Sequence, residues 1–216
     1  MNNLMWRSCS IVATFVAASL TFGCAGLSQQ YKATTEAMAI NYTVNKEQFI
    51  IPKEKVFVTS NDERLNKEVI GEGAKSTVGS RFMGYLAFGV FYAAIPDQPT
   101  LRDQEDPVGI FKTAMTERLS RNDIIITTNK ESAPLVLELS VRRFNLDFNF
   151  GKWVGEAGYI ARVKRHEEII CESTVYEKST AFNLYGYGSG EKAINEAFNK
   201  AINKLDINNC FSKLKK

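Results

Sequence analysis

The stretch LVLELSVRRFNLDFNF, residues 135–150, decides the fold of this chain. Its first half carries apolar side chains at every second position, at Leu135, Leu137, Leu139 and Val141. Its second half does the same in the opposite parity, at Phe144, Leu146, Phe148 and Phe150. This period of two is typical of a strand with one buried face. The change of parity predicts either a β-bulge near Arg142 and Arg143 or a strand that passes between two apolar environments.

Further strands are predicted on both sides of this stretch. Upstream, residues 55–59 form a strand that ends at the turn residues 60–62, and residues 124–126 form a short one. Downstream, Gly151 ends the long strand, and the strands that follow cover residues 159–163, 169–176 and 180–185. The first two of these are separated by a charged turn at residues 165–168.

Two amphipathic helices are predicted as well. Asp106 and Pro107 favour a helix start, and this helix ends near Asn122. Its apolar stripe consists of Val108, Phe111, Ala114, Met115 and Leu119. The final helix, about residues 191–205 with Ser189 as its N-cap, has an apolar side made of Ile194, Ala197, Phe198, Ala201, Ile202 and Leu205. We therefore predict an α+β domain, a mainly antiparallel sheet with both helices on one face in β-α-β-β-β-α order.

The N-terminus has the pattern of an export signal. Arg7 is followed by an uncharged apolar run over residues 11–22, and then by Gly23 and Cys24. The run is short for a membrane span, which needs roughly 20 apolar residues. An ordinary cleaved signal and a retained membrane anchor are the alternatives to a lipoprotein signal.

Residues 20–24, LTFGC, resemble the lipobox of bacterial lipoproteins, although Thr21 and Phe22 are not the commonest residues there. In that family signal peptidase II cuts before the cysteine, which then carries the lipid. The resemblance implies that Cys24 is lipidated, and Ala25 fits sorting to the outer membrane. The predicted plan is a signal peptide at 1–23, a polar tether at 24–48, a single domain at 49–210 and a basic tail at 211–216.

Composition and charge narrow the function. The chain has 216 residues, of which 44% are hydrophobic and 24% charged, and this balance is typical of a globular protein. Its net charge is only +3, and removal of the signal takes away Arg7. A nucleic-acid partner would require a strong basic excess or a clustered basic face, so we predict no nucleic-acid binding.

Residues 82–95, FMGYLAFGVFYAAI, carry no charge and form an apolar insert. One interpretation is a buried hairpin with glycines at turns or close backbone contacts. The other is an exposed loop that contacts lipid or a partner protein. In the second case the contacting residues are Phe82, Tyr85, Leu86, Phe88, Phe91 and Tyr92.

Reactive groups are few. Cys171 and Cys210 form an even pair in an exported protein, so they are either a disulfide or two buried thiols. The single histidine, His166, lies in a charged turn, which leaves a nucleophile without a base and the cysteines without a zinc ligand set. We therefore predict no catalytic residue, no metal and no cofactor. A basic group on the strands is either solvated or contacts anionic lipid headgroups: Arg142, Arg143, Lys152, Arg162, Lys164 and Arg165.

The segments DPVGIFKTAMTERLSRNDIII (106–126), APLVLELSVRRFNLDF (133–148) and GEKAINEAFNKAINKL (190–205) resemble YajG-type outer-membrane lipoproteins. They are also similar to the auxiliary lipoproteins of lipid-transport ABC systems. The resemblance implies an accessory, non-enzymatic role in the cell envelope, at the outer membrane facing the periplasm, with an envelope protein as partner. Surface exposure stays open. The alternative is a lipid-handling component in which the apolar insert, helped by Phe144, Phe148 and Phe150, contacts acyl chains.

Overall fold

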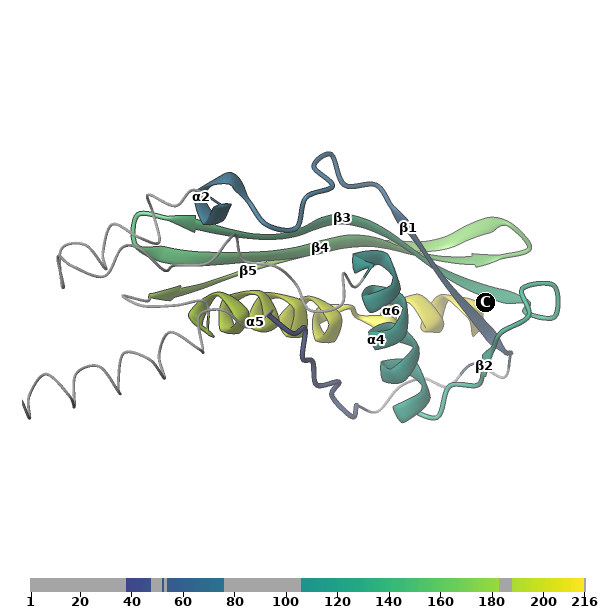
Figure 1. Cartoon of the computed structure of the whole chain (residues 1–216). Helices are drawn as coiled ribbons and strands as arrows, with labels where there is room; N and C mark the ends of the chain where they lie inside the picture. The colour runs from purple at the N-terminus through teal and green to yellow at the C-terminus, as the bar shows by residue number, and fades with distance from the viewer. Residues whose placement is uncertain (1–37, 48–51, 53, 76–105, 183–187, 216) are drawn as a thin grey trace, which may run out of the picture.

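A five-stranded sheet with two long helices on one face organises the chain, as the computed structural model in Figure 1 shows. The structure describes residues 38–47, 52, 54–75, 106–182 and 188–215. The strands are β1 (Val56–Asp62), β2 (Ile126–Thr127), β3 (Leu135–Asn149), β4 (Lys152–Arg165) and β5 (Glu168–Phe182). The helices are α2 (Glu72–Lys75), α4 (Pro107–Arg121), α5 (Gly188–Lys204), α6 (Ile207–Ser212) and the 3-10 turn η3 (Lys213–Lys215).

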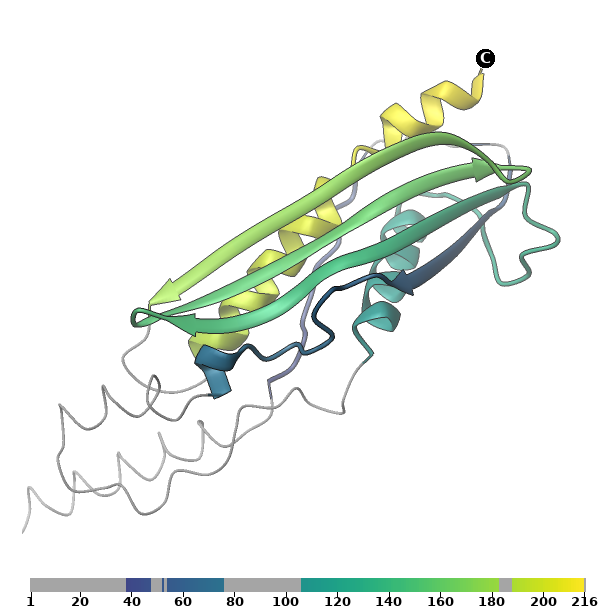
Figure 2. The ribbon, with the colours of Figure 1, turned by 90° about the horizontal axis from the view of Figure 1, so that it is seen from above.

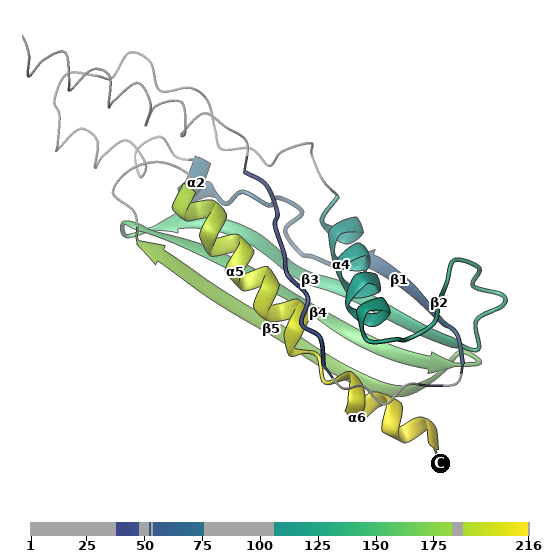
Figure 3. The same cartoon turned by 90° about the horizontal axis from the view of Figure 1, so that it is seen from below.

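The sheet is mixed but mostly antiparallel, in the order β2-β1-β3-β4-β5. β3, β4 and β5 form a long antiparallel meander, whereas β1 pairs in parallel with both β2 and β3. Figures 2 and 3 show α4 and α5 lying across the same face of this sheet. The predicted α+β class is confirmed.

The bulge predicted in β3 is present. The pairing register between β3 and β4 shifts between Val141 and Arg143, where one extra residue is inserted. Because side chains alternate along a strand, this insertion keeps Phe144 on the same buried face as Val141. Of the two alternatives for the change of parity, the bulge is therefore the correct one.

The meander is longer than predicted, because β4 begins at Lys152 instead of 159 and β5 runs unbroken to Phe182. A separate strand at 180–185 was wrong for the described part, since residues 180–182 continue β5 opposite the start of β4. Gly155, near the start of β4, looks like a loop residue in the sequence. A Cβ atom there would lie 2.4 Å from the carbonyl oxygen of Ala193, so glycine is what lets α5 pack on the strand.

The predicted start and end of the first long helix are confirmed, whereas the predicted start of the final helix is not. The Asp106 carboxylate accepts hydrogen bonds from the N–H groups of Val108 and Gly109 at 3.0 and 3.2 Å, and the helix ends at Arg121 with Asn122 as its C-cap. α5 begins at Gly188, so Ser189 lies inside its first turn and the prediction of Ser189 as the N-cap was wrong.

Aromatic rings fill the space between the helices and the sheet. Phe111 of α4 packs edge-to-face on Phe144, Tyr159 and Phe198, with ring centroids 4.9–5.8 Å apart in this group. Aromatic pairs prefer this arrangement, and each such pair adds about 0.5–1.5 kcal/mol beyond its buried area. One side chain from each helix and two from the sheet thus meet at a single point of the core.

Candidate functional sites: the N-terminal strap and the open sheet face

The segment 38–47, here called the strap, lies along α5 on the side of α4, as Figure 3 shows. Met38 and Val44 are buried, and Ile40 and Tyr42 pack against the core. These residues were predicted to belong to a polar tether over 24–48. That prediction is wrong for 38–47, because alternate apolar side chains fix the segment to the domain, and residues 24–37 lie outside the described residues.

Three asparagines of α5 hold the strap by pairing with its backbone. Their Oδ1 atoms accept N–H groups from every second strap residue: Asn41 to Asn195 at 3.0 Å, Thr43 to Asn199 at 2.6 Å and Asn45 to Asn203 at 2.8 Å. Their Nδ2 groups donate to the strap carbonyls two residues before those N–H groups: Asn195 to Ala39 at 3.1 Å, Asn199 to Asn41 at 3.2 Å and Asn203 to Thr43 at 2.8 Å. Each side-chain amide therefore takes the place of a neighbouring strand.

The spacing of the two elements explains why the pairing continues. Four residues of α-helix rise about 6.0 Å. Two residues of extended chain rise about 6.6 Å. Asparagines spaced by four residues along α5 therefore meet strap residues spaced by two. Asn122, the C-cap residue that follows α4, extends the row, because its Oδ1 accepts the N–H of Glu47 at 2.6 Å and its Nδ2 donates to the carbonyl of Asn45 at 3.3 Å.

Arg118 of α4 joins both helices to the end of the strap. Its guanidinium is buried and donates to the carbonyls of Ile202 and Leu205, at the end of α5, at 2.8 and 3.0 Å. It also donates to both carboxylate oxygens of Glu47 at 3.1 and 3.2 Å. A cation at the last carbonyls of a helix satisfies groups that have no partner within the helix and offsets its dipole.

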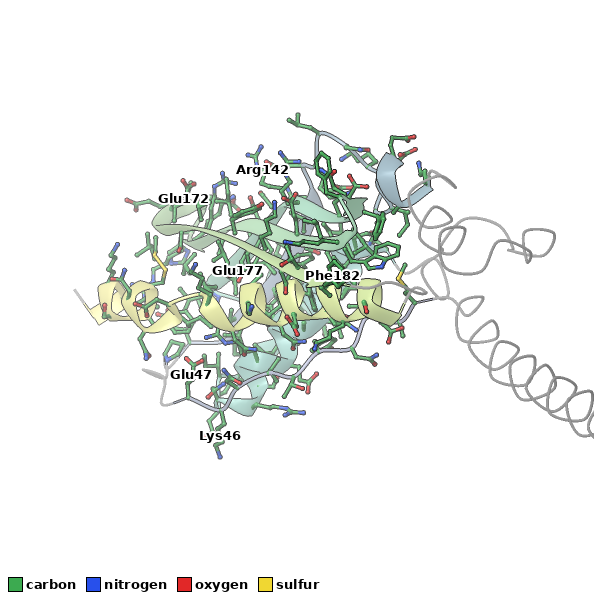
Figure 4. All side chains as sticks on the ribbon, turned by 90° about the vertical axis from the view of Figure 1, so that its left-hand side faces the viewer. Lys46, Glu47, Arg142, Glu172, Glu177 and Phe182 are labelled. Carbon is green, nitrogen blue, oxygen red and sulfur yellow. A yellow bond between two sulfur atoms is a disulfide. The ribbon has the colours of Figure 1, made fainter. Side chains whose placement is uncertain are left out.

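The face of the sheet turned away from α5 is charged. Figure 4 shows Arg142 and Glu172 on this side, whereas Lys46 and Glu47 lie beyond α5. Arg162 donates to Glu172 at 2.6 Å and to Ser140 at 3.1 Å. Other pairs join the face to its surroundings: Lys164 to Glu138 at 2.7 Å, Arg142 to Glu63 at 2.5 Å and Arg165 to Glu54 at 2.9 Å. Much of the predicted basic group is thus engaged with acids on the sheet, Glu138 and Glu172, or directly beside it, Glu54 and Glu63.

Several groups at or near this face have shifted pKa values: the hydrogen bond from Ser140 lowers the pKa of Glu63, and the hydrogen bond to Glu172 raises the pKa of Arg162. The side-chain hydrogen bond from Arg64 holds the pKa of the Asp62 carboxyl well below its ordinary value. Desolvation, followed by the hydrogen bond to Glu156, raises the pKa of Tyr176 to about 12. All four shifts stabilise the form present at neutral pH, so these groups keep their charge state around neutral pH.

Cys171 and Cys210 form a disulfide with their sulfur atoms 2.01 Å apart, which ties β5 to α6. The predicted tail at 211–216 is wrong in its first residues, because Phe211 is buried and Leu214 packs against the core. Phe144 and Phe148 belong to the core rather than to a lipid-contacting surface, whereas Phe150 is exposed at a turn. The remaining predicted site residues lie outside the described residues: Cys24, Phe82, Tyr85, Leu86, Phe88, Phe91 and Tyr92.

The described ranges carry no sign of a metal site or of a membrane-spanning helix. There, no three histidine, cysteine, aspartate or glutamate side chains gather into a set that could hold a metal ion. None of the helices in those ranges combines the length and apolar character that a membrane crossing demands. His166 lies exposed in the β4–β5 turn, as the sequence predicted.

The sheet, the helix pair and the strap define a class of small α+β protein. No family model and no curated protein matches the chain. Its fold is similar to that of protein XCC0632 from Xanthomonas campestris, described as DUF330, with a TM-score of 0.52, 12% identity and coverage of 83% of this chain and 97% of that one. At this identity the similarity shows the fold alone.

Two further solved structures are less similar, with TM-scores below 0.5. The hypothetical protein CT253 from Chlamydia trachomatis has a TM-score of 0.45 at 9% identity, covering 76% of this chain and 99% of that one. Lipoprotein GNA1162 from Neisseria meningitidis has a TM-score of 0.28 at 10% identity, covering 60% of this chain and 85% of that one.

Proposed function

We propose that this chain is a lipid-anchored, non-enzymatic binding component of the bacterial cell envelope. Cys24 carries the lipid, and the domain faces the periplasm from the outer membrane. The LTFGC stretch supports the anchor. The disulfide between Cys171 and Cys210 supports export, because disulfides persist in oxidising compartments and are rare in the cytosol.

The observation that carries the binding role is the free edge of β5. This strand has 15 residues and pairs with β4 on one side, and no other described strand pairs with it. Proteins usually shorten, cover or interrupt such an edge, because its backbone groups are a template for another strand. We infer that an extended segment of an envelope protein adds to this edge, where its side chains meet Thr174, Tyr176 and Lys178.

The binding role is tested by crosslinking in intact cells. A photoreactive amino acid at Thr174, on the β5 edge, is compared with the same group at Lys200, which is exposed on α5. We expect one adduct of defined mass from position 174 and none from position 200. Differently tagged copies show whether the captured chain is a second copy. Equal adduct patterns from both positions, or none from 174, would overturn the role of the edge.

The anchor has its own test. Cys24→Ser should abolish incorporation of labelled palmitate and release the protein from the membrane fraction or leave an uncleaved precursor. Cys9→Ser is the matched control, because that cysteine lies within the predicted signal and its replacement should leave the label unchanged. Label that still enters the Cys24→Ser variant contradicts the assignment.

A further inference from the structure

One end of the molecule, here called the hairpin end, gathers segments that are far apart in the sequence. The β3–β4 turn lies there, and Lys152 at the start of β4 pairs with Phe182 at the end of β5. The start of α5 packs at the same end, because a Cβ atom on Gly190 would stand 3.0 Å from the ring of Trp153. Figures 1 and 2 show these elements together.

The strap also begins at the hairpin end. The N–H of Ala39 lies 3.5 Å from a carboxylate oxygen of Glu191, in the first turns of α5. The described part of the strap therefore begins, at Met38, at the hairpin end. The 14 positions from Cys24 to Met38 reach at most about 50 Å when fully extended. The end opposite, where Ile126 pairs with Val56 beside Leu135, is separated from the strap entry by the length of the sheet.

Two exposed aromatic rings mark the hairpin end. Phe150 is 97% exposed and Phe182 is 66% exposed. Phe182 lies against the turn that carries Phe150, since a Cβ atom on Gly151 would stand 3.8 Å from the ring of Phe182. Large apolar side chains at adjacent exposed positions are typical of an interaction site rather than of a solvated surface.

The backbone of Phe150 makes its exposure more telling. Its φ is +47° and that of Gly151 is +76°, so these two residues form the centre of the β3–β4 turn. Turns of this kind favour Asn, Asp or Gly at both central positions, and a bulky residue with positive φ is uncommon. A phenylalanine here meets no need of the turn. It holds an aromatic ring outward at some cost in local backbone energy.

The charge beside the rings suits an anionic surface. Lys152 is exposed directly after the turn. Asp147, on the other strand of the hairpin, directs one carboxylate oxygen to the N–H groups of Ala74 and Phe148 at 3.0 and 2.8 Å. The exposed lysine is therefore the charge that the turn presents, next to two aromatic rings.

We propose that the hairpin tip, defined as Phe150, Phe182 and Lys152, contacts the phospholipid bilayer at the boundary of headgroups and acyl chains. This inference rests on the proposed lipid anchor at Cys24, because the anchored segment enters the domain at the same end. Aromatic rings favour this boundary, and a neighbouring lysine adds attraction to anionic headgroups. The membrane then meets the domain at its narrow end, and the sheet extends away from the lipid.

Tryptophan fluorescence in the full-length, lipidated protein tests this contact. Phe150→Trp is reconstituted into vesicles of phosphatidylethanolamine and phosphatidylglycerol that carry brominated acyl chains. We expect its emission to fall by about half, because a side chain lying roughly 5–10 Å into the headgroup boundary touches the brominated chains. Ile125→Trp is the control, since Ile125 is 53% exposed but precedes β2 at the opposite end. The unsubstituted protein supplies the signal of buried Trp153 for subtraction.

Two results would overturn the proposal. One is quenching of Phe150→Trp that does not exceed that of Ile125→Trp while the protein floats with the vesicles, since the anchor then works without the tip. The other is Phe150→Trp emission that the brominated chains do not quench but that changes when envelope extract is added, because the ring then contacts a protein rather than lipid. Loss of flotation would instead refute the anchor. Phe182→Trp is a second reporter and should be quenched together with Phe150→Trp.

Discussion

Replacing Arg118 by methionine tests whether the meeting point of α4, α5 and the strap stabilises the fold. The Arg118 side chain is 1% exposed, and methionine keeps most of its apolar stem while it removes the guanidinium. The change leaves the carbonyls of Ile202 and Leu205 without these donors, inside the protein. It also leaves Glu47 without its cation.

The structure indicates which of these losses is the larger. A buried polar group that loses its partner costs about 1–3 kcal/mol, and two carbonyls are affected. Glu47 is 37% exposed, so its carboxylate regains water and the lost ion pair adds only up to about 1 kcal/mol. We expect Arg118→Met to lower the free energy of unfolding by about 3–5 kcal/mol, within the range for breaking a buried pair. Glu47→Gln should lower it by about 1 kcal/mol or less.

Urea unfolding followed by far-UV circular dichroism measures both variants, with the disulfide kept oxidised. Arg118→Lys serves as an intermediate case, because an ammonium group cannot reach two carbonyls and a carboxylate in the planar geometry of a guanidinium. Equal destabilisation by Glu47→Gln and Arg118→Met would refute the reasoning. It would mean that the ion pair, and not the pairing with the end of α5, carries the free energy.

Three further changes have definite expected outcomes. Asn199→Asp should destabilise the strap more than Asn199→Ala, because the new carboxylate faces the carbonyls of Asn41 and Asn195. Limited proteolysis within residues 38–47 measures the difference. Equal cleavage of the two variants would contradict the prediction. Cys171→Ser should lower the free energy of unfolding by about 2–4 kcal/mol, because the disulfide closes a long loop. Urea unfolding measures the loss, and the midpoint of the variant should equal that of the parent protein with its disulfide reduced; a different midpoint would contradict this prediction. The pKa of Asp62 is lowered in the folded protein, so ionised Asp62 contributes to the free energy of unfolding above its ordinary pKa of 3.8. This contribution is lost as the pH falls through the lower pKa of the folded state. Asp62→Asn should therefore be less stable than the parent at neutral pH, with a gap that closes in acid, and a pH-independent gap would contradict the assignment.

Patterns local to one element could be predicted from the sequence. The bulge in β3 follows from the change of parity between Val141 and Phe144, and the start of α4 follows from Asp106 and Pro107. Each of these signals lies within a few residues, where one backbone geometry determines the spacing. The early start of β4 was missed because its glycines, such as Gly155, resemble loop residues until the close approach of α5 is known.

The strap could not be predicted by the same means, because its partners are about 150 positions away. Its polar residues at odd positions, such as Asn41 and Thr43, gave the segment the composition of a tether. Two signals were nevertheless present. Asn195, Asn199 and Asn203 are spaced by four on one side of a helix, and the strap alternates apolar residues from Met38 to Val44. Neither pattern alone indicates which segment it pairs with. The two are related only because four residues of helix and two residues of extended chain have nearly the same length.

Arg118 was missed for a related reason. A basic residue close to an apolar helical stripe reads as a solvated side chain whose stem lies along the surface. The structure instead buries it, because the ends of α5 and the strap both present oxygen atoms to the same place. The open face was easier to interpret, since charged residues on alternate strand positions are usually exposed and paired.

The strap also determines how the domain bears a pulling force. With the lipid anchor proposed at Cys24, a force from a bound partner would reach the domain through Met38. The strap and α5 run in the same direction, so this pull acts along the row of asparagine amides and loads their bonds together, in shear. The row can pair again only after sliding by two residues, because its repeat along the strap is two. Tension on the proposed anchor would therefore be shared by the whole row, which ends at Glu47, the residue that Arg118 holds to the interior.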